Sequence, residues 1–108
     1  MTREEAIRKH RELWHWIADE TRRRKDCDVL KDENPDVAKE EPMNSCWLCE
    51  YVRSIGNRCE DCPINWGSET CIRDGSPYNE WTFSFSFDYE ERAKLADTIA
   101  ELSEKEEE

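Results

Sequence analysis

The feature that most constrains this chain is a cluster of cysteines in its middle. Five of the six cysteines fall within CWLCEYVRSIGNRCEDCPINWGSETC, which runs from residue 46 to residue 71. The chain has 108 residues, of which 36% are hydrophobic and 40% are charged. Because so small a chain with so few apolar residues builds only a thin core, we expect a disulfide, a metal ion or a partner chain to stabilise it.

The two CxxC pairs in this cluster are typical of a structural zinc site. Two residues between thiolates let both sulfurs face one ion, and two such pairs supply the tetrahedral set that Zn²⁺ takes. Nine residues separate the pairs. This is shorter than the usual spacing of about 15–20 residues, but the turn-forming run 54–57 can close the loop. The predicted ligands are Cys46, Cys49, Cys59 and Cys62, with Cys71 as an alternative for the last place.

Other uses of the cysteines stay open. Four thiolates also hold iron–sulfur clusters, and spacing alone does not separate the two kinds of site. Disulfides are disfavoured, because MTREEAIRKHRE lacks the apolar run of a signal peptide and a reducing cytoplasm is therefore expected. Redox catalysis at Cys46–Cys49 would need a βαβ setting, for which the sequence has too few strands. Cys27 stands alone in a polar segment and is interpreted as a free thiol.

Charge and motif content restrict the classes of function. The net charge is −11, which opposes binding to a nucleic-acid backbone. No apolar run of about 18 residues exists that could span a membrane. A zinc ion held by cysteines alone has no open position for a substrate, and the sequence carries no phosphate-binding loop or HExxH motif. We therefore expect a protein that is not an enzyme, with no catalytic residues.

Residues 2–25 are predicted to form a long amphipathic helix. Thr2 and Glu5 fit a capping box at its start. Trp16 points away from the apolar face and is expected either to cover a second surface of the chain or to meet a partner. The apolar face recurs at helical spacing and comprises Ala6, Ile7, His10, Leu13, Trp14, Ile17, Ala18 and Thr21. His10 is therefore interpreted as a core histidine, whereas His15 is expected to face solvent.

The remaining segments complete a single predicted domain over residues 1–108. Residues 26–45 are a polar connector in which Asn34 and Pro35 can start one short helix that ends before Pro42. Residues 88–103 form the second long helix, capped by Asp88. A charged tail follows over residues 104–108.

The middle of the chain is expected to be built from loops around the metal. The zinc module spans 46–80, and WTFSFSF over 81–87 alternates in the manner of a strand. Such a strand needs a partner, for which the segment 48–52 or another chain is a candidate. The predicted fold is mainly α, with both long helices packed on a zinc-knuckle insert and with a short β hairpin as an optional element.

Aromatic residues are the candidates for contacts with a partner, since tryptophan and tyrosine often anchor interfaces. The candidates are Trp16, Trp47, Trp66, Tyr78, Trp81, Phe83 and Phe85.

The joint pattern CxxCEY…CxxCPxxW…C, continued by Ser76, Tyr78 and Trp81, resembles a group of small uncharacterised Cys-rich proteins encoded by phages and prophages of Gram-positive bacteria. EEAIxxHRExWxWIAxET over 4–21 and AxxIAEL over 96–102 belong to the same resemblance. The resemblance implies a protein in the cytoplasm of a bacterial host. It also implies metal ligation by Cys46, Cys49, Cys59 and Cys62, with Cys71 in the pattern.

The function expected from these observations is a zinc-stabilised accessory protein that binds a host or phage protein, in host takeover or against a defence system. A nucleic-acid-binding zinc protein is one alternative, although the charge opposes it. A small-ligand binder or an assembly component is another, in which WTFSFSF adds a strand between chains. A homo-oligomer is compatible with the same pattern.

Overall fold

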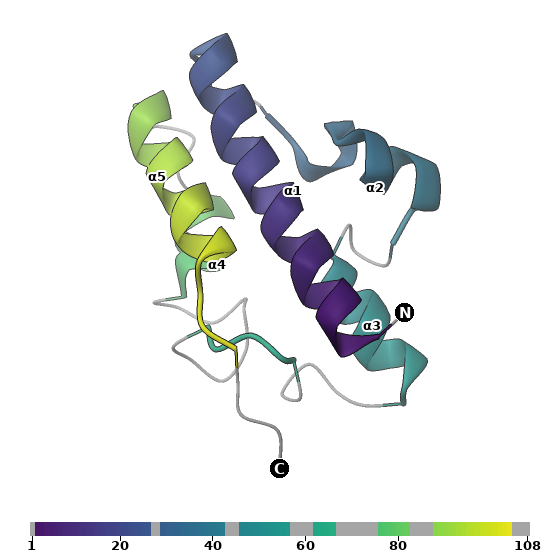
Figure 1. Ribbon diagram of the computed structural model, residues 1–108. Coiled ribbons are helices and arrows are strands. Elements are labelled where there is room, and N and C mark those ends of the chain that lie inside the picture. The colour runs from purple at the N-terminus through teal and green to yellow at the C-terminus, as the bar shows by residue number, and fades with distance from the viewer. Residues whose placement is uncertain are drawn as a thin grey trace.

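Two helices, α1 (Arg3–Arg24) and α5 (Tyr89–Ala100), pack side by side and form the main contact of the fold (Figure 1). The structure is a computed structural model that describes residues 2–26, 29–42, 46–56, 62–66, 76–82 and 88–104. Four shorter elements complete it, namely the 3₁₀ turn η1 (Lys31–Glu33) and the helices α2 (Pro35–Glu40), α3 (Trp47–Ser54) and α4 (Pro77–Thr82). α3 packs against α1, and α4 packs against α5. The prediction of a mainly helical fold is confirmed.

Helix α1 forms as its sequence predicts. The Thr2 hydroxyl accepts the backbone N–H of Glu5 at 3.1 Å and so caps the first turn. The helix ends at Lys25, which has a left-handed φ of 54° and donates its N–H to the carbonyl of Thr21. The buried residues are those of the predicted apolar face: Ala6, Ile7, His10, Leu13, Trp14, Ile17, Ala18 and Thr21.

The predicted caps of α2 and α5 are also present. The side-chain oxygen of Asn34 accepts N–H groups from Asp36 and Val37 at 2.9 and 3.4 Å, with Pro35 at the first helical position. α2 ends at Glu40, before Pro42 as expected. Asp88 caps α5 by accepting the N–H of Glu90 at 3.3 Å. These side chains satisfy backbone donors that a helix start leaves without partners.

The strand predicted over 81–87 is wrong where the structure describes it. Trp81 and Thr82 form the end of α4, while residues 83–87 lie outside the described part. The Ser76 hydroxyl accepts the N–H of Asn79 at 3.2 Å, and Pro77 is the first helical residue. This pair of helix-start signals outweighs the two-residue alternation that follows it.

The hairpin partner proposed for that strand is helical as well. Trp47, Leu48 and Val52 are buried at the spacing of a helix in α3, so the segment 46–80 contains helices and is not built from loops alone. Within the described ranges there is no strand. An isolated antiparallel bridge links Ile64 to Glu104, beside a hydrogen bond of 2.9 Å from the Asn65 N–H to the Ser103 carbonyl.

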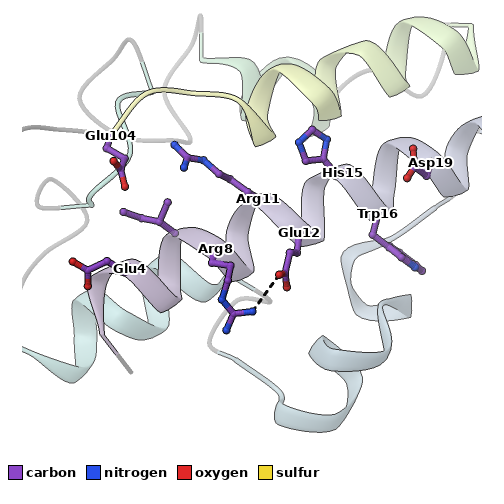
Figure 2. Close-up of a pocket in the computed structure, with 9 residues that line it drawn as sticks. Glu4, Arg8, Arg11, Glu12, His15, Trp16, Asp19 and Glu104 are labelled. Atoms are coloured by element: carbon purple, nitrogen blue, oxygen red, sulfur yellow. Dashed lines mark hydrogen bonds and ion pairs between the residues drawn. The ribbon is translucent and has the colours of Figure 1, made fainter.

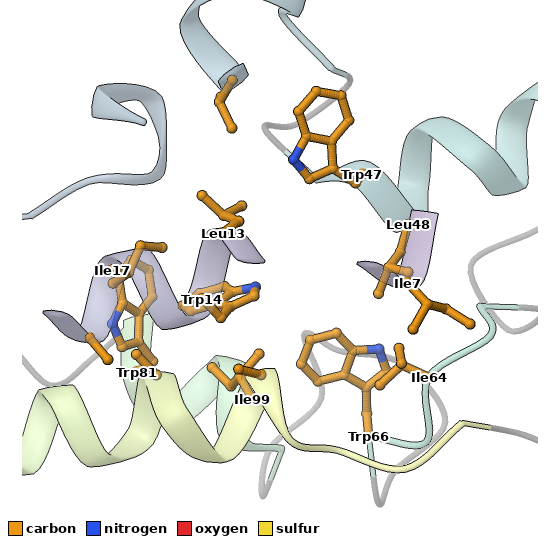
Figure 3. Close-up of a cluster of buried hydrophobic side chains, with 14 of the residues drawn as sticks. Ile7, Leu13, Trp14, Ile17, Trp47, Leu48, Ile64, Trp66, Trp81 and Ile99 are labelled. Atoms are coloured by element: carbon orange, nitrogen blue, oxygen red, sulfur yellow. The ribbon is translucent and has the colours of Figure 1, made fainter. Parts of the chain in front are cut away.

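The core between the helices is rich in aromatic side chains. Figure 3 shows Trp14 of α1 near its centre, with Trp81 and Trp66 on either side. The rings of Trp14 and Trp81 meet edge to face, with centroids 4.8 Å apart. Tyr78 contacts Trp14 in the same manner at 5.8 Å and reaches Trp66 at 6.1 Å. Aromatic pairs of this geometry add to the free energy gained from burial alone.

Candidate functional site

Cys46 and Cys49 lie together at the start of α3, where the first precedes the helix and the second sits in its first turn. A hydrogen bond with the Cys49 side chain is the main cause that lowers the pKa of Cys46 to about 6, while burial acts in the opposite direction. The backbone of Cys49 and Leu48 and the charge of Lys31 lower this pKa further. The pair therefore favours the thiolate near neutral pH, which is the form that binds metal ions.

Lys31 is held beside this pair by an aromatic partner from a distant part of the sequence. Its ammonium group donates to the Tyr78 hydroxyl at 2.8 Å and lies 4.7 Å from the centroid of that ring. A cation over an aromatic face is stabilised by the ring quadrupole. The contact with Tyr78 therefore holds the Lys31 ammonium group where its charge lowers the pKa of Cys46.

Cys62 has a hydrogen-bond donor of its own. The indole N–H of Trp66 donates to the Cys62 sulfur at 3.4 Å. The Trp66 ring is fixed in turn by an edge-on contact with His10, at a centroid distance of 5.6 Å. Donors of this kind orient metal ligands in established sites.

The described residues contain part of the predicted zinc site. Of the predicted ligands, the structure describes Cys46, Cys49 and Cys62. Within the described ranges, no group of three His, Cys, Asp or Glu side chains is close enough to hold a metal ion. Cys59, Cys71 and Cys27 lie outside these ranges. The donors that fit zinc here are the Cys46–Cys49 pair, and the complete four-cysteine site stays a prediction.

The aromatic contact candidates have different places in the fold. Trp47, Trp66 and Trp81 are only 4–5% exposed and belong to the chain's own core. Trp16 and Tyr78 are partly buried and pack against that core. Phe83 and Phe85 lie outside the described residues. Of the described candidates, Trp16 and Tyr78 therefore keep side-chain surface with which to meet a partner.

The two histidines have the expected environments, one buried and one exposed. His10 is 2% exposed, and its Nε2 lies 3.2 Å from the Ile99 carbonyl. Burial is the main cause that lowers the pKa of His10 to about 4, although the hydrogen bond with Ile99 acts in the opposite direction. His15 is exposed, and its Nδ1 lies 3.3 Å from the Asp97 carboxylate on α5.

Arg92 on α5 has a role in the fold that the sequence pattern does not indicate. The side chain is fully buried. Its guanidinium lies 4.1 Å from the centroid of the Trp81 ring, and Nη1 donates to the Trp81 carbonyl at 2.7 Å. No local pattern marks this residue, because its partner is on α4 and comes close only when α4 folds as a helix.

A hollow of about 650 Å³ lies along the outer face of α1 (Figure 2). The figure shows His15 pointing toward α5 and Trp16 pointing to the other side of α1. The lining residues are Glu4, Ile7, Arg8, Arg11, Glu12, His15, Trp16, Asp19 and Glu104. Charged side chains thus make up most of the lining, which also includes Ile7 and Trp16.

Comparisons with known proteins leave the function to be inferred from these residues. No protein-family model matches the chain, and no curated protein or solved structure shows significant similarity to it. The resemblance to phage and prophage proteins stays a prediction for the same reason. Within the described ranges, no helix has the length and apolar character needed to cross a membrane.

Proposed function

We propose that this chain is a zinc-stabilised accessory protein of a phage or prophage, which acts in the bacterial cytoplasm by binding a host or phage protein. The observation that carries the metal part is the Cys46–Cys49 pair, whose side chains share a hydrogen bond at the start of α3. Host takeover and inhibition of a defence system are the two roles that fit a small protein of this kind.

Zinc explains how so polar a chain keeps a fixed fold. Structural zinc provides about 10–16 kcal/mol of apparent binding free energy in small domains, which is comparable with a typical net stability of about 5–15 kcal/mol. Cys46 and Cys49 would supply two thiolates, and Cys59 with Cys62 or Cys71 would supply the others. The ion would then link α3 to the segments that follow it.

The interaction part of the proposal is supported by the surface of the chain. The net charge of −11 and the hollow along α1 give a large charged surface, with the partly buried Trp16 at its edge. Aromatic residues surrounded by polar groups are frequent contact points in protein interfaces.

Native mass spectrometry of the chain purified from the cells that express it tests both parts. We expect one zinc ion per chain in the wild type and none in Cys46→Ser/Cys49→Ser, while Cys27→Ser retains the ion. A partner that co-purifies with the wild type and is lost after zinc removal supports the interaction role. A wild-type chain without metal, or one whose metal survives the double substitution, contradicts the zinc site.

A reactive dithiol is the second candidate, because a Cys of lowered pKa paired with a second Cys at a helix start is also the arrangement of redox-active thiols. The same mass spectrum separates the two cases. A metal-free chain that is two hydrogens lighter, and that regains them on treatment with a reducing thiol, favours the dithiol over zinc.

A further inference from the structure

We propose that the outer face of α1 is the docking surface for a basic segment of a partner protein. The inference rests on the proposed role as a protein-binding chain, and it does not depend on zinc. It concerns the hollow of Figure 2, which none of the described helices covers.

The position of the face follows from the helical repeat. Glu4, Arg8, Glu12, His15 and Asp19 recur at intervals of three or four residues and lie opposite the buried face of α1. α5 and α3 pack against the helix, and among the described residues these five side chains are exposed. Glu4 and Asp19 are about 22 Å apart along the helix axis, since an α-helix rises 1.5 Å per residue. A partner segment of about 15 helical residues can reach both.

The charges in the hollow select a basic partner. The Arg8 guanidinium pairs with Glu12 at 3.1 Å, and Arg11 donates to the Leu102 carbonyl at 3.4 Å. Both arginines therefore have acceptors within the chain. The remaining carboxylates form no ion pair with another described residue; they belong to Glu4, Asp19 and Glu104. Lysine or arginine side chains of a partner complement these groups.

Trp16 supplies the apolar part of the surface. It lines the hollow and is partly buried against the core, so its ring is already fixed in position. A rigid aromatic side chain loses little conformational entropy when a partner packs on it. We therefore expect the basic segment to carry an apolar residue that contacts Trp16.

A second copy of the chain fits this surface less well. If two copies met with their hollows centred on a two-fold axis across the helices, Glu4 of each copy would face Asp19 of the other, and Arg11 would face Glu12 near the axis. The repulsion in both Glu4–Asp19 pairs opposes such a dimer, as does the charge of −11 on each chain. Nucleic acid and anionic lipid are disfavoured by the same charges.

The test is a titration of the ¹⁵N-labelled chain with a synthetic helical peptide of about 20 residues, which carries lysine and arginine on one face and leucine on the other. The control peptide replaces each basic residue with glutamine. In NMR spectra we expect saturable chemical-shift changes that are confined to the amides of α1 around Arg8–Asp19 and to the Trp16 indole N–H. The control peptide should cause no chemical-shift changes. The proposal is overturned if the chemical-shift changes spread over the whole surface, or if the basic peptide does not bind.

Matched variants separate the surface from the general charge of the chain. Glu4→Gln/Asp19→Asn removes two carboxylates from the hollow, and Glu80→Gln/Glu91→Gln removes two from α4 and α5. We expect the first variant to bind the basic peptide about tenfold more weakly and the second to bind within about twofold of the wild type. Equal weakening in both variants overturns the proposal. So does a dimer of the free chain that Glu4→Gln/Asp19→Asn disrupts.

The outcomes also separate this inference from the proposed function. If a partner co-purifies with the chain and its binding is unchanged in Glu4→Gln/Asp19→Asn, the interaction role stands and the docking surface on α1 is wrong. If the basic peptide binds at the hollow but the purified chain carries no zinc, the docking surface stands and the metal part of the proposed function is wrong.

Discussion

The guanidinium of Arg92 lies over the Trp81 ring, 4.1 Å from its centroid, and donates to the carbonyl of the same residue at 2.7 Å. A single tryptophan thus contacts this buried cation through both its side chain and its backbone. The carbonyl belongs to the last turn of α4 as the structure describes it. Arg92 therefore attaches α4 to α5 through both contacts.

The first prediction concerns this contact. Arg92→Met keeps much of the side-chain volume but removes the donor to the Trp81 carbonyl and the stacked cation. We expect a loss of about 2–3 kcal/mol in the free energy of unfolding, because a buried acceptor loses a charged donor. Urea denaturation measures it, with the exposed Arg53→Met as the control. A change below about 0.5 kcal/mol would show that the contact adds little to stability.

The second prediction tests the start of α4. Ser76→Ala removes the hydroxyl that accepts the Asn79 N–H at 3.2 Å. Loss of a capping side chain costs about 1 kcal/mol, and we expect that decrease in urea denaturation. Ser103→Ala, at an exposed position after α5, is the control and should leave stability unchanged. If both substitutions have the same effect, the Ser76 hydroxyl is not a significant cap.

The third prediction is a pH dependence caused by His10. Burial lowers its pKa in the folded chain to about 4, from an ordinary value of 6.5. The unfolded chain therefore binds more protons between these values, and stability decreases as the pH falls from about 6.5 toward 4. Between pH 7 and pH 5 the loss is about 2 kcal/mol.

Urea denaturation at the two pH values measures this loss. The exposed His15 provides the control, since His15→Gln should keep the pH dependence while His10→Gln should remove most of it. If the dependence persists in His10→Gln, His10 is not its source and the prediction is wrong.

The fourth prediction concerns zinc removal. A chelator, or Cys46→Ser/Cys49→Ser, should abolish the cooperative thermal transition seen by circular dichroism, because the metal contributes as much free energy as a small domain has in total. Restoring Zn²⁺ should restore the transition in the wild type but not in the double variant. An unchanged transition after chelation would show that the helical core is stable without metal.

Local signals in the sequence are sufficient to predict the helices that begin with the side-chain caps Thr2, Asn34 and Asp88. Thr2, Asn34 and Asp88 each start a helix as predicted, and the apolar face of α1 is buried as expected from its spacing. Ser76 and Pro77 are also helix-start signals. The two-residue alternation from Trp81 onward favours a strand over the same segment, so the sequence alone does not indicate α4.

The candidate site was predictable only in part, for a different reason. The CxxC spacing identifies Cys46 and Cys49 as a pair, since both lie within a few residues of each other. Lys31 and Tyr78 are 47 residues apart in the sequence, and nothing in either segment indicates their contact. Arg92 depends in the same way on a tertiary contact with Trp81.

The pairing of α1 with α5 also has a consequence for biosynthesis. α1 is made first among the described helices, and its principal packing partner is made last. Its apolar face, with Ile17 and Trp14, therefore remains without that cover on the ribosome until the C-terminal helix emerges. Contacts so distant in sequence slow folding, and exposed apolar surface is prone to aggregation in the meantime. A nascent chain arrested before Tyr89 should accordingly depend on chaperones more than the finished protein does.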